Sequence, residues 1–164
     1  MMANEFKLAP MDGLIKAITV FMLGLLCLFI VFAITGSRFL AIPAACLLVI
    51  YLWIWLRFRP TSFIVDDNAI TVEWPMKSRL IARSDILQTK LVSRAELRNE
   101  TGWALRFGAG GLWGGFGWLW TKKRGIVQMY ISRIDNIVWI ELADGRPWLI
   151  TPERPDKFVR ALSR

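Results

Sequence analysis

The residues with the most distinctive chemistry form a glycine- and aromatic-rich run, Gly108–Arg124, that ends in three consecutive cations. Its glycines permit close backbone approaches, and its rings combine apolar area with polar edges. Rings beside basic side chains suit the boundary between a bilayer and water, where phosphates meet acyl chains. The candidate contacts to an anionic lipid headgroup or a partner protein are therefore Trp113, Phe116, Trp118, Trp120, Lys122, Lys123 and Arg124.

A purely structural role is the alternative for each part of this run. The rings could instead fill the core of a small domain, which needs large apolar side chains, and both possibilities stay open. The basic triplet could be a solvated face. A nucleotide-binding loop is disfavoured, because the run lacks the Gly-Lys-Ser/Thr ending and is followed by a strand pattern rather than a helix.

No group of residues in the sequence suggests catalysis or metal binding. The chain contains no histidine, which is the commonest general base and metal ligand. Its carboxylates lack the second group that acid–base chemistry needs. Cys27 and Cys46 lie within apolar stretches, which favours small buried hydrophobic residues over a disulfide. The sequence therefore predicts a protein that is not an enzyme and needs no cofactor or metal.

Two long apolar stretches in the first third of the chain dominate its organisation. Residues 14–35 contain one charge near their start, and residues 39–56 contain none. About 20 apolar residues cross a bilayer core, so both stretches are predicted to be transmembrane helices. The short link 36–38 makes them antiparallel neighbours. A cleavable signal peptide is the alternative for the first stretch, but that stretch is longer than a typical signal core and follows Glu5 and Asp12.

The charges that flank these stretches predict the orientation of the chain. Positive residues precede the first stretch and follow the second, whereas Arg38 alone lies in the link. Because positive residues stay on the cytoplasmic side, we expect a multi-pass protein of the cell inner membrane with both termini in the cytoplasm. The residues expected at this membrane interface are Lys16, Trp53, Trp55, Arg57 and Arg59.

The part of the chain after Leu56 is strongly basic. The net charge of the chain is +8. The three cations and two carboxylates before Leu56 contribute +1, which leaves a net charge of +7 for the remainder. Such a balance suits nucleic acid or an anionic membrane surface. A tether beside the bilayer makes lipid headgroups the nearer partner, so no nucleic acid is expected.

Beyond residue 57 the apolar pattern changes to the alternation typical of β-strands. About seven short strands are predicted, separated by turn signals such as Asp66–Asn68. The last segment is predicted to be a helix that ends at Leu162, with Thr151 as its cap and Pro152 at its first position. A compact β domain closed by a terminal helix follows from this pattern.

The order of these features resembles the bacterial PH-like domain proteins. The resemblance rests on the two spans, the Arg57–Pro60 junction, Ser84–Ile86, the glycine-rich aromatic run and the Thr-Pro-Glu-x-Pro-Asp-x-Phe ending. It covers roughly Arg57 to Leu162. It implies two roughly orthogonal antiparallel sheets of seven strands capped by a C-terminal helix. The family has no single activity, so the resemblance implies no catalytic residues.

The sequence thus predicts an α+β membrane protein, in which a two-helix transmembrane hairpin precedes a mostly β, PH-like barrel of about seven strands capped by a helix. The expected function is a membrane-anchored, non-catalytic binding or scaffolding module that recruits a protein or an anionic lipid at the cytoplasmic face. The alternative is an accessory or assembly subunit of a larger membrane protein complex. The predicted parts are an N-terminal cytoplasmic arm (1–13), the transmembrane hairpin (14–56, with spans at 14–35 and 39–56) and a cytoplasmic PH-like domain (57–164).

Overall fold

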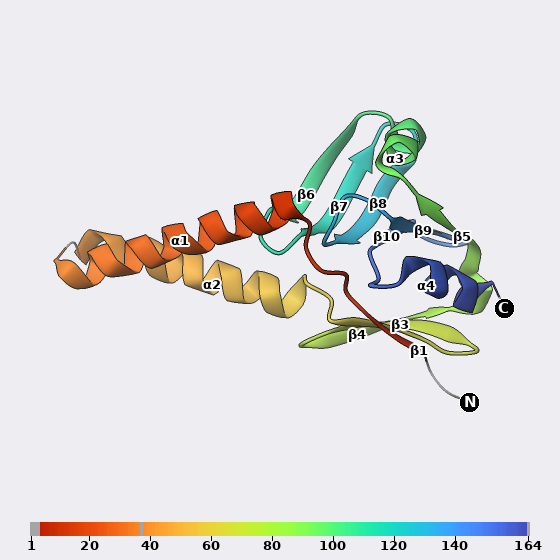
Figure 1. Ribbon diagram of the computed structural model, residues 1–164, viewed down its shortest axis with the longest axis horizontal. Coiled ribbons are helices and arrows are strands. Elements are labelled where there is room, and N and C mark those ends of the chain that lie inside the picture. Colours follow the sequence, from red (N-terminus) through yellow and green to blue (C-terminus); the bar gives the residue numbers. More distant parts are fainter. Residues whose placement is uncertain (1–3, 37, 164) are drawn as a thin grey trace.

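Two long helices project from one side of a β domain in the computed structural model, which describes residues 4–36 and 38–163 (Figure 1). Helix α1 spans Gly13–Thr35 and helix α2 spans Ala41–Arg57, with the short 3-10 helix η1 (Arg38–Leu40) before α2. Asp12 caps α1 by accepting a hydrogen bond from the N–H of Ile15 at 2.8 Å. The predicted pair of apolar helices is confirmed.

Both helices are long and apolar enough to cross a bilayer, judged by length and composition. The mean hydropathy is 2.9 for Gly13–Thr35 and 2.4 for Arg38–Arg57, and only 11% of either window is buried. Large apolar side chains face outward, as Phe21 does with 72% of its surface exposed. Cys27 and Cys46 are free thiols, as expected, but they are exposed on the helix surfaces rather than buried.

The N-terminal segment before α1 is a strand of the β domain. It pairs in antiparallel fashion with the strand that follows α2, so the helices leave and re-enter one sheet through neighbouring strands. The sequence suggested only a separate arm for residues 1–13. The first sheet consists, in order, of β1 (Asn4–Lys7), β2 (Ser62–Val65), β3 (Ala69–Trp74) and β4 (Lys77–Ala82).

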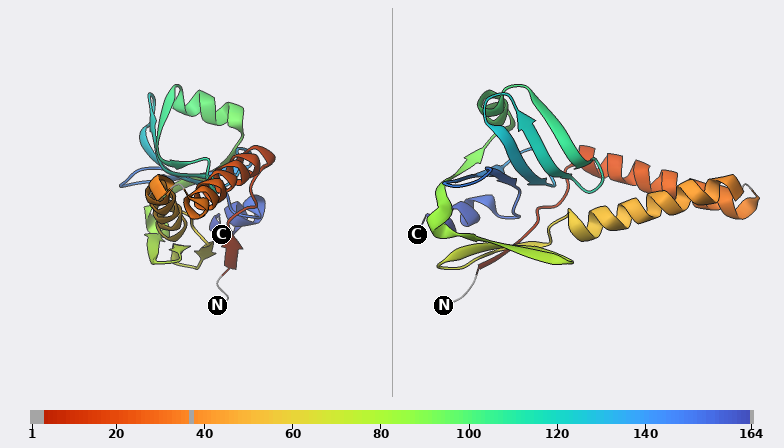
Figure 2. Two further views of the ribbon diagram at one scale, coloured as in Figure 1. Left: turned by 90° about the vertical axis from the view of Figure 1, so that its left-hand side faces the viewer. Right: turned by 180° about the vertical axis from the view of Figure 1, so that it is seen from behind.

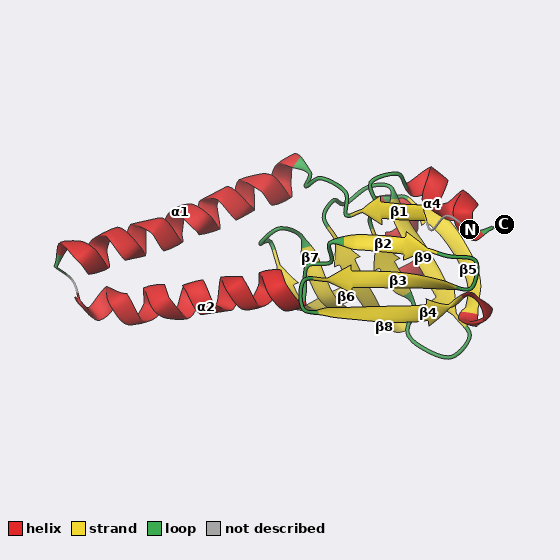
Figure 3. Ribbon diagram, turned by 90° about the horizontal axis from the view of Figure 1, so that it is seen from below, coloured by secondary structure: helices red, strands yellow, loops and turns green. Residues whose placement is uncertain are grey.

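The second sheet has six strands and lies behind the first in Figure 3. Its neighbours are antiparallel except for β10 and β8, which run parallel. The purely antiparallel arrangement expected from the resemblance is therefore wrong at this pair. In order across the sheet, the strands are β5 (Ile86–Val92), β9 (Ile137–Leu142), β10 (Trp148–Ile150), β8 (Gly125–Ile131), β7 (Gly115–Thr121) and β6 (Ala104–Gly110).

The two sheets do not close into a barrel, so this part of the prediction is wrong. On one side the chain passes from β4 to β5 through the 3-10 helix η2 (Arg83–Asp85). The edge strands are β1 and β4 in the first sheet and β5 and β6 in the second, and no pairing joins the two sheets within the described residues. The inward positions of β4 include Lys77 and Arg79, whose charged ends cannot be sealed into an apolar core. The predicted strand number is also too low, because β2–β10 make nine strands after α2.

The main core lies between the two sheets and is closed by helix α4 (Pro155–Leu162). Phe158 of α4 is fully buried and meets the rings of Phe6 and Phe63 edge-on, with centroid separations of 5.2 and 6.2 Å. The ring of Phe6 comes from β1. The segment before α1 therefore contributes to the same core as the C-terminal helix. The sequence predicted the helix over this core but not the contribution of the N-terminal segment.

The start of α4 differs from the prediction, because Thr151 and Pro152 precede the helix. Thr151 is fully buried, and its hydroxyl accepts a hydrogen bond from the N–H of Ser132 at 2.9 Å. Pro152 forms an isolated bridge with Leu8. Thr151 thus fixes the N-terminal segment to the second sheet instead of capping a helix.

Helix α3 (Arg94–Thr101) covers the outer face of the second sheet and was not predicted. Ser93 and Glu96 form a capping box, in which each side chain bonds the backbone N–H of the other residue. Leu97 packs against a second core cluster that includes Trp139 and Leu149. Both faces of β9 and β10 are therefore covered.

Candidate binding surface

The hairpin of β6 and β7 is built around two glycines that face each other across the strands. Gly108 and Gly117 are register partners with φ values of 128° and 129°. A Cβ on Gly108 would overlap the carbonyl oxygen of Phe116, and one on Gly117 would overlap that of Phe107. Only glycine accepts both the positive φ and this close approach. The glycine-rich run Gly108–Arg124 therefore forms most of an antiparallel hairpin.

Part of the inward face of this hairpin stays exposed. The ring of Phe107 is the register partner of Trp118, and Leu105 is the partner of Trp120. The exposed fractions are 51% for Phe107, 43% for Trp118 and 52% for Trp120. An apolar surface of this kind on a domain usually marks an interaction site. The open cleft here has a volume of about 410 Å³ and is lined by Phe107, Trp118, Trp120, Ile126 and Arg146.

Two cations lie on the inward face of β4. Lys77 and Arg79 are the register partners of Trp74 and Val72, two core residues, so all four point inward. The guanidinium of Arg79 lies 4.9 Å from the centroid of the Trp148 ring, and its Nη1 donates to Oε1 of Gln128 at 3.2 Å. Arg79 therefore bridges the two sheets.

The positive charge beside the cleft includes the end of α2. The pKa of Lys77 is lowered, first because burial penalises its charged form and then because Arg57 and Arg79 lie near it. The ammonium of Lys77 also lies 4.6 Å from the centroid of the Trp74 ring. Repulsion among these like charges is unfavourable, and a bound anion would reduce it. We call the space lined by Phe107, Trp118, Trp120, Ile126 and Arg146 the open cleft, and Arg57, Lys77 and Arg79 the cation cluster.

The seven residues predicted from sequence as contacts fall into the open cleft, the interior, the surface of α2 and a basic turn. Trp118 and Trp120 line the open cleft. Phe116 is fully buried, and Trp113 packs edge-on against the rings of Tyr51 and Trp55 of α2. Their contact with lipid or a partner stays a prediction. The basic turn, at the opposite end of β7 from Trp113, contains Lys122, Lys123 and Arg124.

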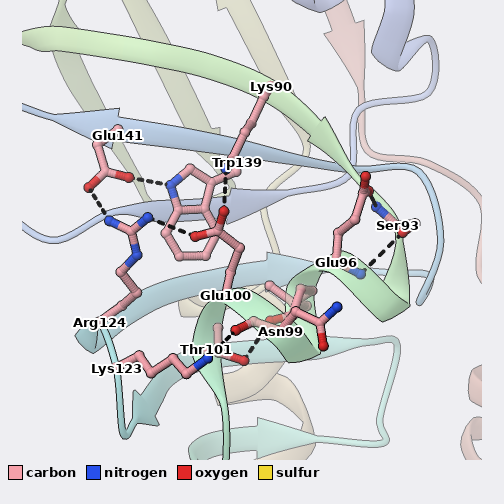
Figure 4. A network of polar contacts seen from close by, with 11 residues as sticks. Lys90, Ser93, Glu96, Asn99, Glu100, Thr101, Lys123, Arg124, Trp139 and Glu141 are labelled. Carbon is pink, nitrogen blue, oxygen red and sulfur yellow. Dashed lines mark hydrogen bonds and ion pairs between the residues drawn. The ribbon is translucent and has the colours of Figure 1, made fainter.

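The basic turn between β7 and β8 is tied to α3 (Figure 4). Arg124 donates to Glu100 at 2.7 Å and lies 3.6 Å from Glu141, while the ammonium of Lys90 meets the other oxygen of Glu100 at 2.7 Å. These hydrogen bonds lower the pKa of Glu100 to about 2, with the bond from Lys90 as the largest cause. Lys123 donates to the carbonyl oxygen of Asn99 at 2.8 Å. Much of the triplet's charge therefore holds α3 in place.

The predicted membrane-interface anchors gather at the domain-side end of the helix pair. The guanidinium of Arg57 lies 5.1 Å from the ring centroid of Trp53, and that of Arg59 lies 4.4 Å from that of Trp55. Lys16 lies in the first turn of α1, on the same side of the pair. Burial lowers the pKa of Arg59. Their place at a bilayer surface stays a prediction.

Sequence reasoning missed Phe107, Ile126, Arg79 and Arg146 because the cleft joins strands distant in the chain. It also missed an open concavity of about 1120 Å³ between β1, η2 and α4. Arg83 there donates to the carbonyl oxygens of Ala161 and Leu162 at 3.1 and 2.6 Å, which caps α4. The concavity has a mixed lining of cations and carboxylates, with Arg154, Lys157 and Arg160 beside Glu5, Asp67 and Glu153.

Comparison with known proteins gives one match. The family model described as Bacterial PH domain matches residues 61–164, which run from the start of the first strand after α2 to the end of the chain. Searches of the curated proteins and of the solved structures give no match. Within the part of the chain that the structure describes, no cluster of three or more Cys, Asp or Glu side chains could hold a metal ion.

Proposed function

The chain belongs to the bacterial PH domain family, and on that premise we propose that it is a membrane-anchored, non-catalytic binding module. PH domains are in general binding modules without catalytic activity. Helices α1 and α2 act as the anchor, and the domain binds a protein or an anionic lipid at the cytoplasmic face of the inner membrane. Both chain termini lie on that face.

The observation that carries this proposal is the way the helices join the domain. α1 follows β1 and α2 precedes β2, and these two strands are neighbours in one sheet. Both ends of the apolar pair are therefore fixed at one side of the domain. The hydroxyl of Ser132 donates to the carbonyl oxygen of Ala9 at 2.6 Å, and the N–H of Ala9 donates to Thr151 at 2.9 Å. This arrangement supports a rigid stalk rather than a flexible tether.

The open cleft is the proposed binding surface. Its aromatic wall offers apolar area and its lining includes Arg146, while Lys77 and Arg79 add positive charge on the inward face of β4. This combination matches an anionic amphiphile, which is either a lipid headgroup with the start of its acyl chains or an acidic and apolar protein segment. Each cation close to an anionic surface contributes about 1 kcal/mol before screening by salt.

Lysine substitutions within the helices test the anchor. Phe21 and Val49 are exposed residues of α1 and α2, so a lysine at either place disturbs little packing inside the protein. A lysine near the centre of a span costs about 3 kcal/mol of insertion free energy. We expect the double variant Phe21→Lys/Val49→Lys to leave carbonate-washed membranes. The matched control Leu80→Lys/Leu87→Lys changes equally exposed residues of the domain and should stay in the membrane fraction.

Purification of the full chain in mild detergent tests the cleft. We expect the protein to retain a partner protein or anionic lipid, and Trp118→Ala/Trp120→Ala to lose it while keeping its thermal unfolding temperature. Leu87→Ala removes an exposed apolar residue of β5 outside the cleft and should retain the partner. Equal retention by the two variants would remove the cleft from the proposal.

An accessory subunit of a larger membrane complex is the second candidate. The observation that favours it is the outward face of the helix pair, where Phe21, Val31 and Val49 are each more than half exposed. Such a surface can pack on other membrane helices as well as on lipid. A detergent-purified protein that runs alone, or only with copies of itself, would contradict this candidate.

A further inference from the structure

The turn that joins β6 to β7 lies against the helix pair rather than beyond its end, and Figures 1 and 2 both show it beside the domain-side part of the helices. Leu112 is 2% exposed and belongs to one apolar cluster with Leu26 of α1 and Tyr51 of α2. The ring of Trp113 lies 4.8 Å from that of Trp55, centroid to centroid, in an edge-on arrangement. The turn is therefore part of the same apolar bundle as the two helices.

Two polar groups of the backbone of this turn are bonded by a side chain of α1. The hydroxyl of Thr19 accepts a hydrogen bond from the N–H of Trp113 at 2.9 Å and lies 3.2 Å from the carbonyl oxygen of Gly111. The N–H of Gly111 donates to the carbonyl oxygen of Gly114 at 2.9 Å. Thr19 itself is 3% exposed. Irregular backbone persists at membrane depth only when its polar groups are paired and covered by protein, and Thr19 supplies such a partner for Trp113 and Gly111.

Trp113 also adopts a backbone conformation that is costly for a bulky side chain. Its φ is 61°, in the left-handed region that favours glycine. Such strain persists only where the surroundings fix it, and the contacts with Tyr51 and Trp55 supply that constraint. The turn is therefore built to hold its side chains on α2.

The lengths of the helices place this turn relative to a bilayer. Beyond Thr19, α1 continues to Thr35 for about 24 Å, and from Tyr51 back to Arg38 the chain covers about 20 Å, at 1.5 Å per residue. The hydrocarbon core is about 30 Å thick. A pair that spans it must use at least one further turn of each helix on the domain side. The boundary then falls near Lys16 and Arg57, and the turn lies inside it.

We infer that the β6–β7 turn enters the apolar layer of the bilayer together with α1 and α2, with membrane lipid as its outer neighbour. The inference rests on the proposed anchoring and adds a third inserted element to it. The side chain of Arg106 lies at the base of the turn, where a Cβ added to Gly110 or Gly115 would touch it, and in this arrangement it would face the headgroup phosphates. Residues 111–114 lie deeper than this cation.

Spin-label accessibility in the reconstituted full chain tests the depth of the turn. In a Cys27→Ala/Cys46→Ala background, nitroxide is attached at Trp113→Cys in the turn, at Val49→Cys in α2, and at Leu87→Cys on β5. Collision with oxygen, which prefers lipid, is compared with collision with a water-soluble nickel complex. We expect oxygen to dominate at position 49 and, at shallower depth, at position 113. The nickel complex should dominate at position 87.

The outcomes separate this inference from the proposed function. If oxygen dominates at position 49 but the nickel complex dominates at 113, the turn lies in water and the inference is overturned, while the anchor stands. If the nickel complex dominates at 49 as well, the anchoring proposal itself fails. Should Trp113→Cys not fold, the label at Gly110→Cys takes its place, because Gly110 has no positive φ and its added Cβ would meet only the side chain of Arg106. Oxygen must then reach position 110 more readily than position 87.

Discussion

Thr19 is a single residue that connects the helix pair to the domain. Like Thr35 at the other end of α1, it donates to the carbonyl oxygen four residues earlier, at 2.8 Å for Thr19 and 3.0 Å for Thr35. Only Thr19 also bonds the backbone of the β6–β7 turn. The two threonines therefore form a natural matched pair for separating helix effects from docking effects.

Replacing Thr19 by valine should lower the free energy of unfolding by about 1–3 kcal/mol, because the N–H of Trp113 and the carbonyl of Gly111 lose their partner in an apolar setting. Thr35→Val should change it by much less, since Thr35 bonds only its own helix. Thr19→Ser should restore most of the loss. Unfolding of the detergent-solubilised chain measures all three. Equal losses from the two valine variants would contradict the docking role.

Gly117 makes a second prediction at the residue scale. Alanine there would have to adopt a φ of 129° and overlap the carbonyl oxygen of Phe107, so we expect a loss of at least about 2 kcal/mol in unfolding free energy. Gly110→Ala, in the same hairpin, should stay within about 0.5 kcal/mol of the parent. Thermal denaturation compares the pair. A mild Gly117→Ala variant would mean that the hairpin can relax at this point.

The sequence predicted the helices more readily than it predicted which side chains contact one another. The long apolar stretches predicted the helix pair to within two residues, because periodicity is not needed to recognise a continuous apolar run. The rings of the glycine-rich run could not be divided into core and surface. Phe116 and Trp118 occupy the same face of β7, yet one is fully buried and the other is 43% exposed, a difference that alternation along the strand does not reveal.

At the scale of elements, α3 is the part whose position depends most on charge. Its docking surface is small, and Leu97 is its main apolar contact with the sheet. Glu100 instead receives hydrogen bonds from Lys90 and Arg124, and Arg124 also approaches Glu141. The Ser93-x-x-Glu96 capping box was visible in the sequence, but its short helix lacks an apolar stripe, which is why the element was missed.

The docking of α3 should therefore depend on pH. The pKa of Glu100 is depressed to about 2 from an ordinary value of 4.5, so its ion pairs contribute fully above pH 4.5 and are lost as the pH falls toward 2. Hydrogen exchange should show protection of the α3 amides decreasing over this interval. Glu100→Gln should lower protection at neutral pH and flatten the pH dependence, whereas Glu153→Gln, outside this network, should leave both unchanged. An unchanged pH profile in Glu100→Gln would assign the effect to other carboxylates.

At the scale of the whole molecule, the strand before α1 makes the helix pair a rigid extension of the domain. Phe6 of β1 is 9% exposed and packs edge-on against Phe158 of α4. Phe6→Ala should cost about 3 kcal/mol of unfolding free energy and increase hydrogen exchange in β1 before the rest of the first sheet. Phe39→Ala, at a 91% exposed position, is the control and should be nearly neutral. A uniform increase of hydrogen exchange across the sheet would indicate that β1 does not open separately from the other strands.

The overall architecture was predictable only in outline. An apolar helix pair followed by a β domain with a terminal helix follows from composition and alternation, and the family match over residues 61–164 supports the β domain. The open edges of the two sheets depend on long-range geometry. The sequence suggested closure because alternating strands usually close around a core, whereas Lys77 and Arg79 on the inward face of β4 prevent it. The proposed binding surface exists because of this departure from a closed barrel.

The central claim is that the helix pair crosses a membrane and holds the domain on one face. Its most direct test is the sidedness of single cysteines at Arg38, between the helices, and at Leu87, on the domain, in a Cys27→Ala/Cys46→Ala background. With a membrane-impermeant maleimide added to intact cells, we predict labelling of Arg38→Cys, and labelling of Leu87→Cys only after the inner membrane is permeabilised. If both cysteines react from the same side, the helices do not span the membrane and the claim is contradicted.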